Sequence, residues 1–274
     1  MHLTGSSGEH SLLRNEPATL KLSIAWLVLR LFWEAMPSEM AALTVHIAHG
    51  KAAFFSWHRR FISVYEQYLK DKCTYTGALP YWDWTLDWEN LPGSPIFSAV
   101  AGFGGNGDHT APKGVGDGHC VTDGPFADLH PLFYGSTLRP HCLSRGFTDF
   151  HGRNASPAVV QEVLGSADYE TFFLAVENGP HNVAPNGIRG DFYSFTAPYD
   201  PIFYLHHAQL DRLWFLWQRK DAGHRLREYT GRTDTSNAAS LEDLLVLGGL
   251  APDITVSQVM DTEGAELCYR YSLS

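Results

Sequence analysis

The chain has 274 residues, of which 44% are hydrophobic and 18% charged, and its formal net charge is -10. This length and composition suffice for one large hydrophobic core and exclude intrinsic disorder as the default state. The 20 basic residues are scattered, which argues against nucleic acid as a partner because phosphate contacts require clustered Lys and Arg.

The first apolar segment, residues 22–29, follows Lys21 and is interrupted by Arg30. It is too short to span a bilayer, and a signal peptide would begin closer to Met1. We interpret it as a core helix in preference to a degraded signal peptide. The sequence therefore predicts no membrane span and leaves the cytoplasmic and secretory routes both open.

Residues 54–70 place apolar side chains at helical spacing, which predicts a helix. His58 falls on the same stripe as Phe54, Phe61 and Tyr65. Because such a stripe faces the core of a globular protein, we expect His58 to be buried.

The middle of the chain is predicted to be irregular. Residues 75–88 form a turn-rich aromatic segment, and residues 89–157 are dense in Gly and Pro, which indicates long surface loops. Glycines 102, 104 and 107 match a dinucleotide-binding pattern, but no strand precedes them and no helix follows. We therefore exclude a nucleotide site there.

Two further helices are predicted downstream, over residues 157–177 and from Asp200-Pro201 to Trp217. After Asp221 the helical pattern weakens, with a short apolar helix expected at 241–247 and a strand at 267–273. We expect one domain, residues 1–274, with a metal-binding core at about 41–220 and a tail at 221–274.

The four cysteines, Cys73, Cys120, Cys142 and Cys268, show no C-x-x-C spacing. This argues against a zinc ribbon or a thioredoxin-type motif. Their even number permits two disulfides without specifying a pairing.

The chemistry is expected at two histidine clusters, His49 with His58 and His181 with His206 and His207. Imidazole is the ligand that proteins use for copper, zinc and non-haem iron, so two separate clusters indicate a metal held between helices. The many aromatic residues, 8 Trp, 12 Tyr and 16 Phe, suit a pocket for a flat aromatic molecule, although core packing explains them equally well. The sequence thus predicts a metalloenzyme.

The segments around these histidines resemble the tyrosinase, catechol oxidase and haemocyanin-like superfamily of type 3 copper proteins. The string from His49 through Trp57-His58-Arg59 looks like its first metal motif, and His181-Asn182 with residues 200–214 is similar to its second. Residues 81–84, Tyr-Trp-Asp-Trp, are typical of its short fungal members. The resemblance implies a mainly α fold, in which a four-helix bundle houses the metal site among long irregular loops and a few short strands.

In that family two copper ions, each held by three imidazoles, together bind dioxygen. His49 and His58 match the second and third ligands of the first ion, and His181 and His207 match the first and third ligands of the second. His206 is expected off the ligand face, because adjacent helix positions lie about 100° apart.

Two more residues are assigned from the resemblance. Asp211 is expected to support a ligand from behind, and Asn182 is expected to act in catalysis by orienting a water or a substrate hydroxyl. Arg59 and Arg212 are expected to anchor helices through carboxylates.

The sequence departs from the family pattern at two places. Where the second motif usually has a histidine four residues after His181 stands Pro185, which cannot ligate a metal. In the first motif the nearest additional histidine is His46, three residues before His49, and an i,i+3 pair on a helix can share one metal. We therefore expect His46 as the third ligand of the first ion. Asp191 and Glu177 are weak candidates to complete the second ion's site.

Three functions are compatible with these residues. The first is a copper oxidoreductase that oxidises a phenolic or catecholic compound with dioxygen, in secondary metabolism. The second is a redox-neutral, zinc-dependent lyase similar to the fungal cyclopenases, which Pro185 favours. The third is a degenerate, non-catalytic binding protein. We favour the first because most of the family are oxidases; the chain also resembles the short form that lacks a C-terminal plug domain.

Overall fold

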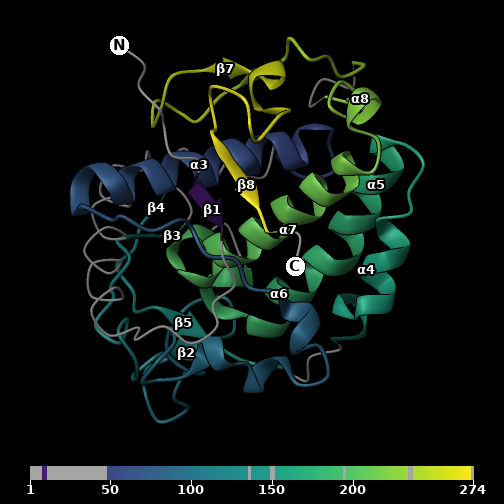
Figure 1. The fold of residues 1–274 in the computed structure, drawn as a ribbon. Coiled ribbons are helices and arrows are strands. Elements are labelled where there is room, and N and C mark those ends of the chain that lie inside the picture. Colours follow the sequence, from purple (N-terminus) through teal and green to yellow (C-terminus); the bar gives the residue numbers. More distant parts are fainter. Residues whose placement is uncertain are drawn as a thin grey trace.

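The computed structural model describes residues 8–10, 48–134, 137–148, 152–193, 196–233 and 237–272. The predicted mainly α fold is confirmed: helices surround the core, and the strands are short (Figure 1). The helix expected at 22–29 and the candidate ligand His46 lie outside the described residues. Within the described part, no helix is both long and apolar enough to cross a membrane.

Two long helices form the centre of the fold, α3 (Ala53–Cys73) and α7 (Ile202–Arg219), and they pack against each other. Both were predicted from their apolar spacing. The carboxylate of Asp200 accepts a hydrogen bond from the Ile202 backbone N–H (3.0 Å), which fixes the start of α7 as the Asp-Pro pair suggested. Its first three turns are buried on every side, so α7 is a central helix rather than an amphipathic surface helix.

The helix expected at 157–177 is divided into α4 (Pro157–Val163) and α5 (Tyr169–Val176). Asp168 begins α5, because its side chain accepts a hydrogen bond from the Thr171 backbone N–H (2.8 Å).

A π-helical turn (Glu177–His181) joins α5 to α6 (Asn182–Ile188). Pro180 and Pro185 lie inside this helical run and lack the N–H groups that a regular helix would use. The turn ends on His181, and such π-turns are frequent at functional sites.

The strands of the described residues pair in four two-stranded sheets, and α8 is a single turn (Ala222–Arg225). The parallel pair is β1 (Gly8–His10) with β8 (Tyr269–Tyr271), and the strand expected at 267–273 is thereby confirmed. The antiparallel pairs are β2 (His119–Cys120) with β5 (Ser144–Arg145), β3 (Phe133–Tyr134) with β4 (Thr137–Leu138), and β6 (Leu244–Leu245) with β7 (Ile254–Thr255).

The expected helix at 241–247 is wrong, because part of this segment is strand β6. Its leucines are followed by Gly248 and Gly249, which both have positive φ (58° and 87°). The chain therefore reverses after Leu247, and Leu245 pairs with Ile254.

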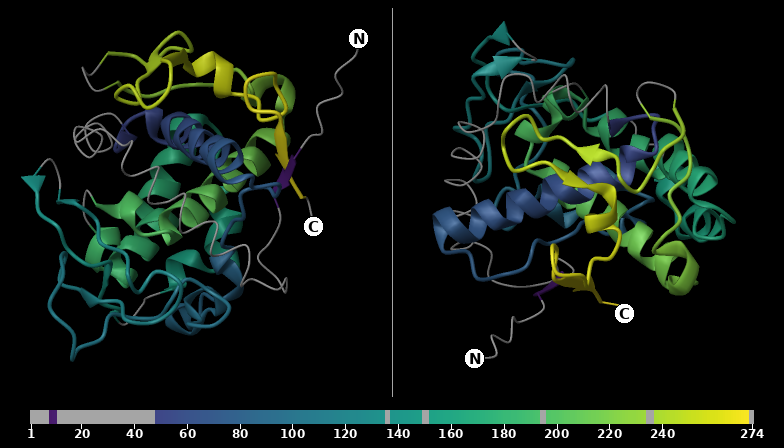
Figure 2. Two further views of the ribbon diagram at one scale, coloured as in Figure 1. Left: turned by 90° about the vertical axis from the view of Figure 1, so that its left-hand side faces the viewer. Right: turned by 90° about the horizontal axis from the view of Figure 1, so that it is seen from above.

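The C-terminal segment and the long loops lie on opposite sides of the helical centre. Figures 1 and 2 show the C-terminal segment (yellow) over α3 and the loops that carry β2 and β5 (teal) beyond α7. A disulfide between Cys120 and Cys142 joins two of these loops, and Cys268 is a free, exposed thiol. One of the two disulfides that the cysteine count permits is therefore present among the described residues.

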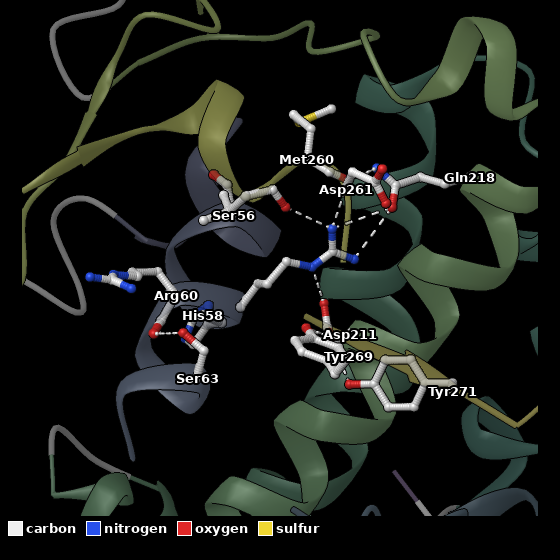
Figure 3. A network of polar contacts seen from close by, with 12 residues as sticks. Ser56, His58, Arg60, Ser63, Asp211, Gln218, Met260, Asp261, Tyr269 and Tyr271 are labelled. Atoms are coloured by element: carbon white, nitrogen blue, oxygen red, sulfur yellow. Dashed lines mark hydrogen bonds and ion pairs between the residues drawn. The ribbon is translucent and has the colours of Figure 1, made fainter. Parts of the chain in front are cut away.

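A buried polar network joins α3, α7 and β8 at Asp211 (Figure 3). The carboxylate of Asp211 accepts hydrogen bonds from Arg59 Nε (2.5 Å), Tyr269 Oη (2.5 Å) and Tyr271 Oη (2.6 Å). The Arg59 guanidinium lies 3.6 Å from the centre of the Trp214 ring. Arg59 thus anchors helices through a carboxylate, as its place beside His58 suggested.

Candidate metal centre

Five imidazoles gather where α3, the π-turn and α7 meet. His49 precedes α3, His58 lies in α3, His181 ends the π-turn, and His206 and His207 lie in α7. Ring centres are 5.2 Å apart for His49 and His58, 5.5 Å for His49 and His181, and 5.6 Å for His181 and His207. The structure therefore brings together the four histidines that the sequence analysis selected from two distant segments.

The two imidazoles with defined hydrogen bonds have their Nε2 atoms left as acceptors. His58 Nδ1 lies 2.7 Å from the Phe54 carbonyl oxygen and must donate to it, so its lone pair is on Nε2. His181 Nδ1 lies 3.1 Å from the Asn182 side-chain oxygen, which places its lone pair on Nε2 as well. His58 Nε2 is buried without a hydrogen-bond partner, which is the state of a nitrogen ready to bind a metal.

Burial keeps these imidazoles neutral. It lowers the pKa of His58, His181 and His207 well below the ordinary value, and the neighbouring histidines lower it further. The pKa of His206 falls to about 3 for the same reason, burial. Because a metal binds the neutral imidazole, this cluster can accept a cation near pH 7 without first losing protons.

Aromatic rings surround the cluster. The Phe54 ring centre is 5.3 Å from that of His58 and 5.2 Å from that of His181, and Phe203 lies 4.2 Å from His207. Trp57 packs edge-on against His58 at 5.1 Å, and Trp84 lies 6.5 Å from His206. These side chains exclude water from the helical side of the cluster, so polar contacts there are strengthened.

A cavity of about 670 Å³ opens onto the cluster from the other side. Its lining includes three histidines of the cluster, the aromatic residues Tyr134, Phe192, Tyr193 and Phe203, the polar or small residues Asn182, Asn186, Pro185 and Pro198, and one carboxylate, Asp117. Phe203 is 3% exposed and lines the cavity, as expected of a core residue next to a ligand. This size and lining suit a small aromatic molecule.

His206 lies beside the other histidines and is fully buried. Its ring centre is 5.6 Å from that of His181 and 5.3 Å from that of His207. Because α7 is buried on both faces at this point, a side chain that leaves the ligand face still lies in the core. That His206 turns off the ligand face stays a prediction.

Of the two carboxylates considered for the second ion, Asp191 has both oxygens engaged, whereas Glu177 Oε2 is buried without a hydrogen-bond partner among the described residues. Asp191 accepts hydrogen bonds from His141 Nε2 (2.8 Å) and from the Ser144 backbone N–H (2.8 Å). Glu177 accepts one from the Gly50 backbone N–H (2.7 Å), and burial raises its pKa to about 7. Glu177 therefore holds the segment that carries His49, a role that the sequence analysis missed because the two residues are far apart in the chain.

Three other residues near the cluster, Asp211, Arg212 and His141, are engaged in ion pairs or hydrogen bonds with other side chains. Asp211 binds Arg59, the residue after His58, and so fixes α3 next to α7 behind the cluster. Arg212 lies 3.8 Å from the carboxylate of Asp83. His141 is structural through Asp191, whose hydrogen bond and charge outweigh burial and raise the pKa of His141.

The donor set fits copper in its chemistry but is incomplete in its geometry. Neutral, buried imidazoles with unpartnered nitrogens are ligands that copper accepts. Across the described residues, however, no three His, Cys, Asp or Glu side chains already form one metal-binding group. Pro185 lines the cavity and supplies no ligand atom, and His46 lies outside the described residues.

Comparison with known proteins identifies relatives of this chain. The family model of the common central domain of tyrosinase matches residues 25–220. Tyrosinase ustQ of Aspergillus flavus is 47% identical over 231 residues, covering 81% of this chain and 64% of the relative. Tyrosinase-like protein phomQ2 of Diaporthe leptostromiformis is 46% identical, covering 82% of this chain and 60% of the relative. The chain thus spans less than two thirds of the length of these curated relatives.

The fold is also similar to a solved structure. A variant of a polyphenol oxidase from Thermothelomyces thermophila superimposes with a TM-score of 0.80 at 27% identity, covering 95% of this chain and 88% of the other. The chain therefore shares its overall fold with a solved polyphenol oxidase.

Proposed function

Since the chain belongs to the tyrosinase family, we propose that it is a copper-dependent oxidase that converts a phenolic or catecholic compound into a quinone with dioxygen. The observation that carries this proposal is the cluster of neutral, buried imidazoles at the floor of an aromatic cavity. We also propose that residues 1–274 form one domain, and that its metal-bearing helices make up a four-helix bundle.

The proposed ligand pairs follow the family resemblance, and all four histidines lie in one cluster, in which the rings of His58 and His207 are stacked with centres 4.0 Å apart. His49 and His58 would hold the first copper ion with His46, and His181 and His207 would hold the second. Bound copper would supply dioxygen binding and electron transfer from the substrate. The chain's own contribution is to fix the imidazole orientations through Phe54 and Asn182.

The cavity residues would position the substrate ring. The side-chain oxygen of Asn182 is engaged by His181 Nδ1, so its amide N–H groups are the donors that remain for a substrate hydroxyl. Phe192, Phe203 and Tyr134 offer apolar surface to a flat ring. The substrate we propose is therefore a phenol or catechol whose ring carries no charge, as found among the aromatic intermediates of secondary metabolism.

The experiment measures copper per chain by mass spectrometry and oxygen uptake with catechol, for the wild type and His58→Asn. We expect two copper ions and oxygen uptake for the wild type, and fewer ions with uptake at background for the variant. His224→Asn, which changes an exposed histidine outside the cluster, is the matched control and should behave like the wild type. Tightly bound zinc without oxygen uptake would refute the oxidase and favour the lyase that Pro185 suggests.

A further inference from the structure

We infer that the substrate carries a cationic group, such as an ammonium, on the chain attached to its phenol ring, and that Asp117 selects for this group. This inference rests on the proposed function and deepens it, because it narrows the class of the substrate. The ring itself stays uncharged, and Asp117 interacts with the chain that the ring carries.

The first observation is the charge of the cavity lining. Asp117 is its carboxylate, and among the described residues that line the cavity there is no lysine or arginine. The rest of the lining consists of uncharged side chains and of His49, His181 and His207, the proposed metal ligands. Because opposite charges attract and like charges repel across a binding site, this lining favours a cation over an anion.

The second observation is that the carboxylate of Asp117 is available to a ligand. The residue is exposed, and no hydrogen bond or ion pair engages its carboxylate within the part of the chain that the structure describes. Two acidic residues close to it in the sequence are engaged: Asp108 accepts a hydrogen bond from the Thr110 backbone N–H (2.8 Å), and Asp123 accepts one from that of Gly105 (2.7 Å). Those carboxylates hold loops, whereas that of Asp117 does not.

The third observation is that Asp117 stands on a fixed turn. Gly116 and Asp117 both have positive φ (56° and 61°), and the Gly118 N–H donates to the Val115 carbonyl oxygen (2.9 Å), as in a tight two-residue turn. The Gly116 carbonyl oxygen accepts a hydrogen bond from the Gly190 N–H (2.9 Å), which ties this turn to the next wall of the cavity. A carboxylate on a fixed turn loses little backbone freedom when it binds a cation.

Two arginines lie near the cavity but are not part of its lining. The guanidinium of Arg139 lies 5.3 Å from the ring centre of Tyr134, and that of Arg189 lies 4.1 Å from the ring centre of Tyr193. Both tyrosines line the cavity, and neither arginine does. The arginines therefore cover the tyrosine rings, and the charge that reaches the cavity is that of Asp117.

The test compares three phenols of matched shape for binding to the full chain at pH 7. Tyramine carries an ammonium, 3-(4-hydroxyphenyl)propionate a carboxylate, and 4-propylphenol no charge. Dissociation constants are measured by ligand-observed NMR on the metal-free protein, so that the charge of bound copper does not contribute. The variants are Asp117→Asn and Asp117→Gly, since Asn and Gly both accept a positive φ.

We expect the wild type to bind tyramine more tightly than the propionate. Each Asp117 variant should reduce the ratio of these two dissociation constants about fivefold, the size expected for the loss of one solvent-exposed charge. Binding of 4-propylphenol should not change, because it has no charge to lose contact with. The matched control is Asp253→Asn, which removes an exposed charge from the C-terminal segment, on the opposite side of the helical centre, and should leave the ratio unchanged.

Several outcomes would overturn the inference. An unchanged ratio in both Asp117 variants would show that this carboxylate does not select the substrate, and an equal loss of affinity for all three phenols would show that its role is structural. Tightest binding of the propionate to the wild type, lost in Arg189→Gln, would assign the selection to Arg189 instead. Oxygen uptake with catechol tests the proposed function separately: uptake with an unchanged ratio leaves the oxidase standing without this inference, and a shifted ratio without uptake leaves a cation-selective cavity without the oxidase.

Discussion

Replacing Asp211 by Asn should destabilise the protein strongly, although the two side chains have nearly the same shape. The carboxylate is the counter-charge of Arg59, whose side chain is 0% exposed, and it also accepts hydrogen bonds from Tyr269 and Tyr271. Removing one partner of a buried ion pair leaves an uncompensated charge and costs about 3–5 kcal/mol. The lost tyrosine contacts overlap with this effect, since they share the same carboxylate, so we expect a total of about 4 kcal/mol.

The assay is equilibrium unfolding in urea, followed by far-ultraviolet circular dichroism on the metal-free protein. A matched control is Glu266→Gln, which breaks the ion pair of the neighbouring Arg60 at the surface, where the two side chains are 11% and 33% exposed. Surface pairs contribute little, so the control should lose at most about 1 kcal/mol. If Asp211→Asn lost no more than this control, the reasoning that the charge of Asp211 fixes α3, α7 and β8 together would be wrong.

Two other changes test the metal-free protein. Burial raises the pKa of Glu177 from its ordinary value of 4.5 to about 7, so this carboxyl alone should cost the folded state about 3 kcal/mol as the pH rises from 4.5 through 7, a loss that opposes the stability which the buried neutral histidines gain over that range. Glu177→Gln should remove this loss, giving equal stability at pH 5 and a more stable variant at pH 8 in urea unfolding; a variant that is less stable at pH 8 would contradict the sign. Cys142→Ser should cost about 3 kcal/mol, because the disulfide with Cys120 closes a loop of sequence separation 22, and thermal unfolding with and without reductant checks this. Reductant should lower the unfolding temperature of the wild type and leave that of the variant unchanged. If reductant left the wild type unchanged as well, the disulfide would not contribute this stability.

The helices that carry the site were predictable because their patterns are local. The apolar stripe through Phe54 and Phe61 gave α3 with its buried His58, and the Asp200-Pro201 pair marked the start of α7. The expected helix at 241–247 failed because Gly248 and Gly249 reverse the chain, and pairing with β7 then decides the conformation. In a short apolar segment, the spacing of the residues alone does not distinguish a helix from a strand, and a following turn can decide between them.

The parts of the site that depend on distant residues were not predictable. The bond between Glu177 and Gly50 joins positions 127 residues apart, and the pair of His141 with Asp191 joins positions 50 apart. No spacing rule connects such residues. That α7 is buried on all sides around His206 depends on the elements packed against it, which the sequence of the helix does not specify.

The packing of indole rings against the cluster gives the protein an optical property. Trp57 packs against His58, and Trp84 lies near His206, so both indole rings lie next to the histidine cluster. Oxidised copper is paramagnetic and accepts excitation energy from a nearby indole, whereas zinc has a filled d shell and does neither. The emission of the native tryptophans should therefore fall as Cu(II) enters and stay nearly constant as zinc enters, without any attached dye.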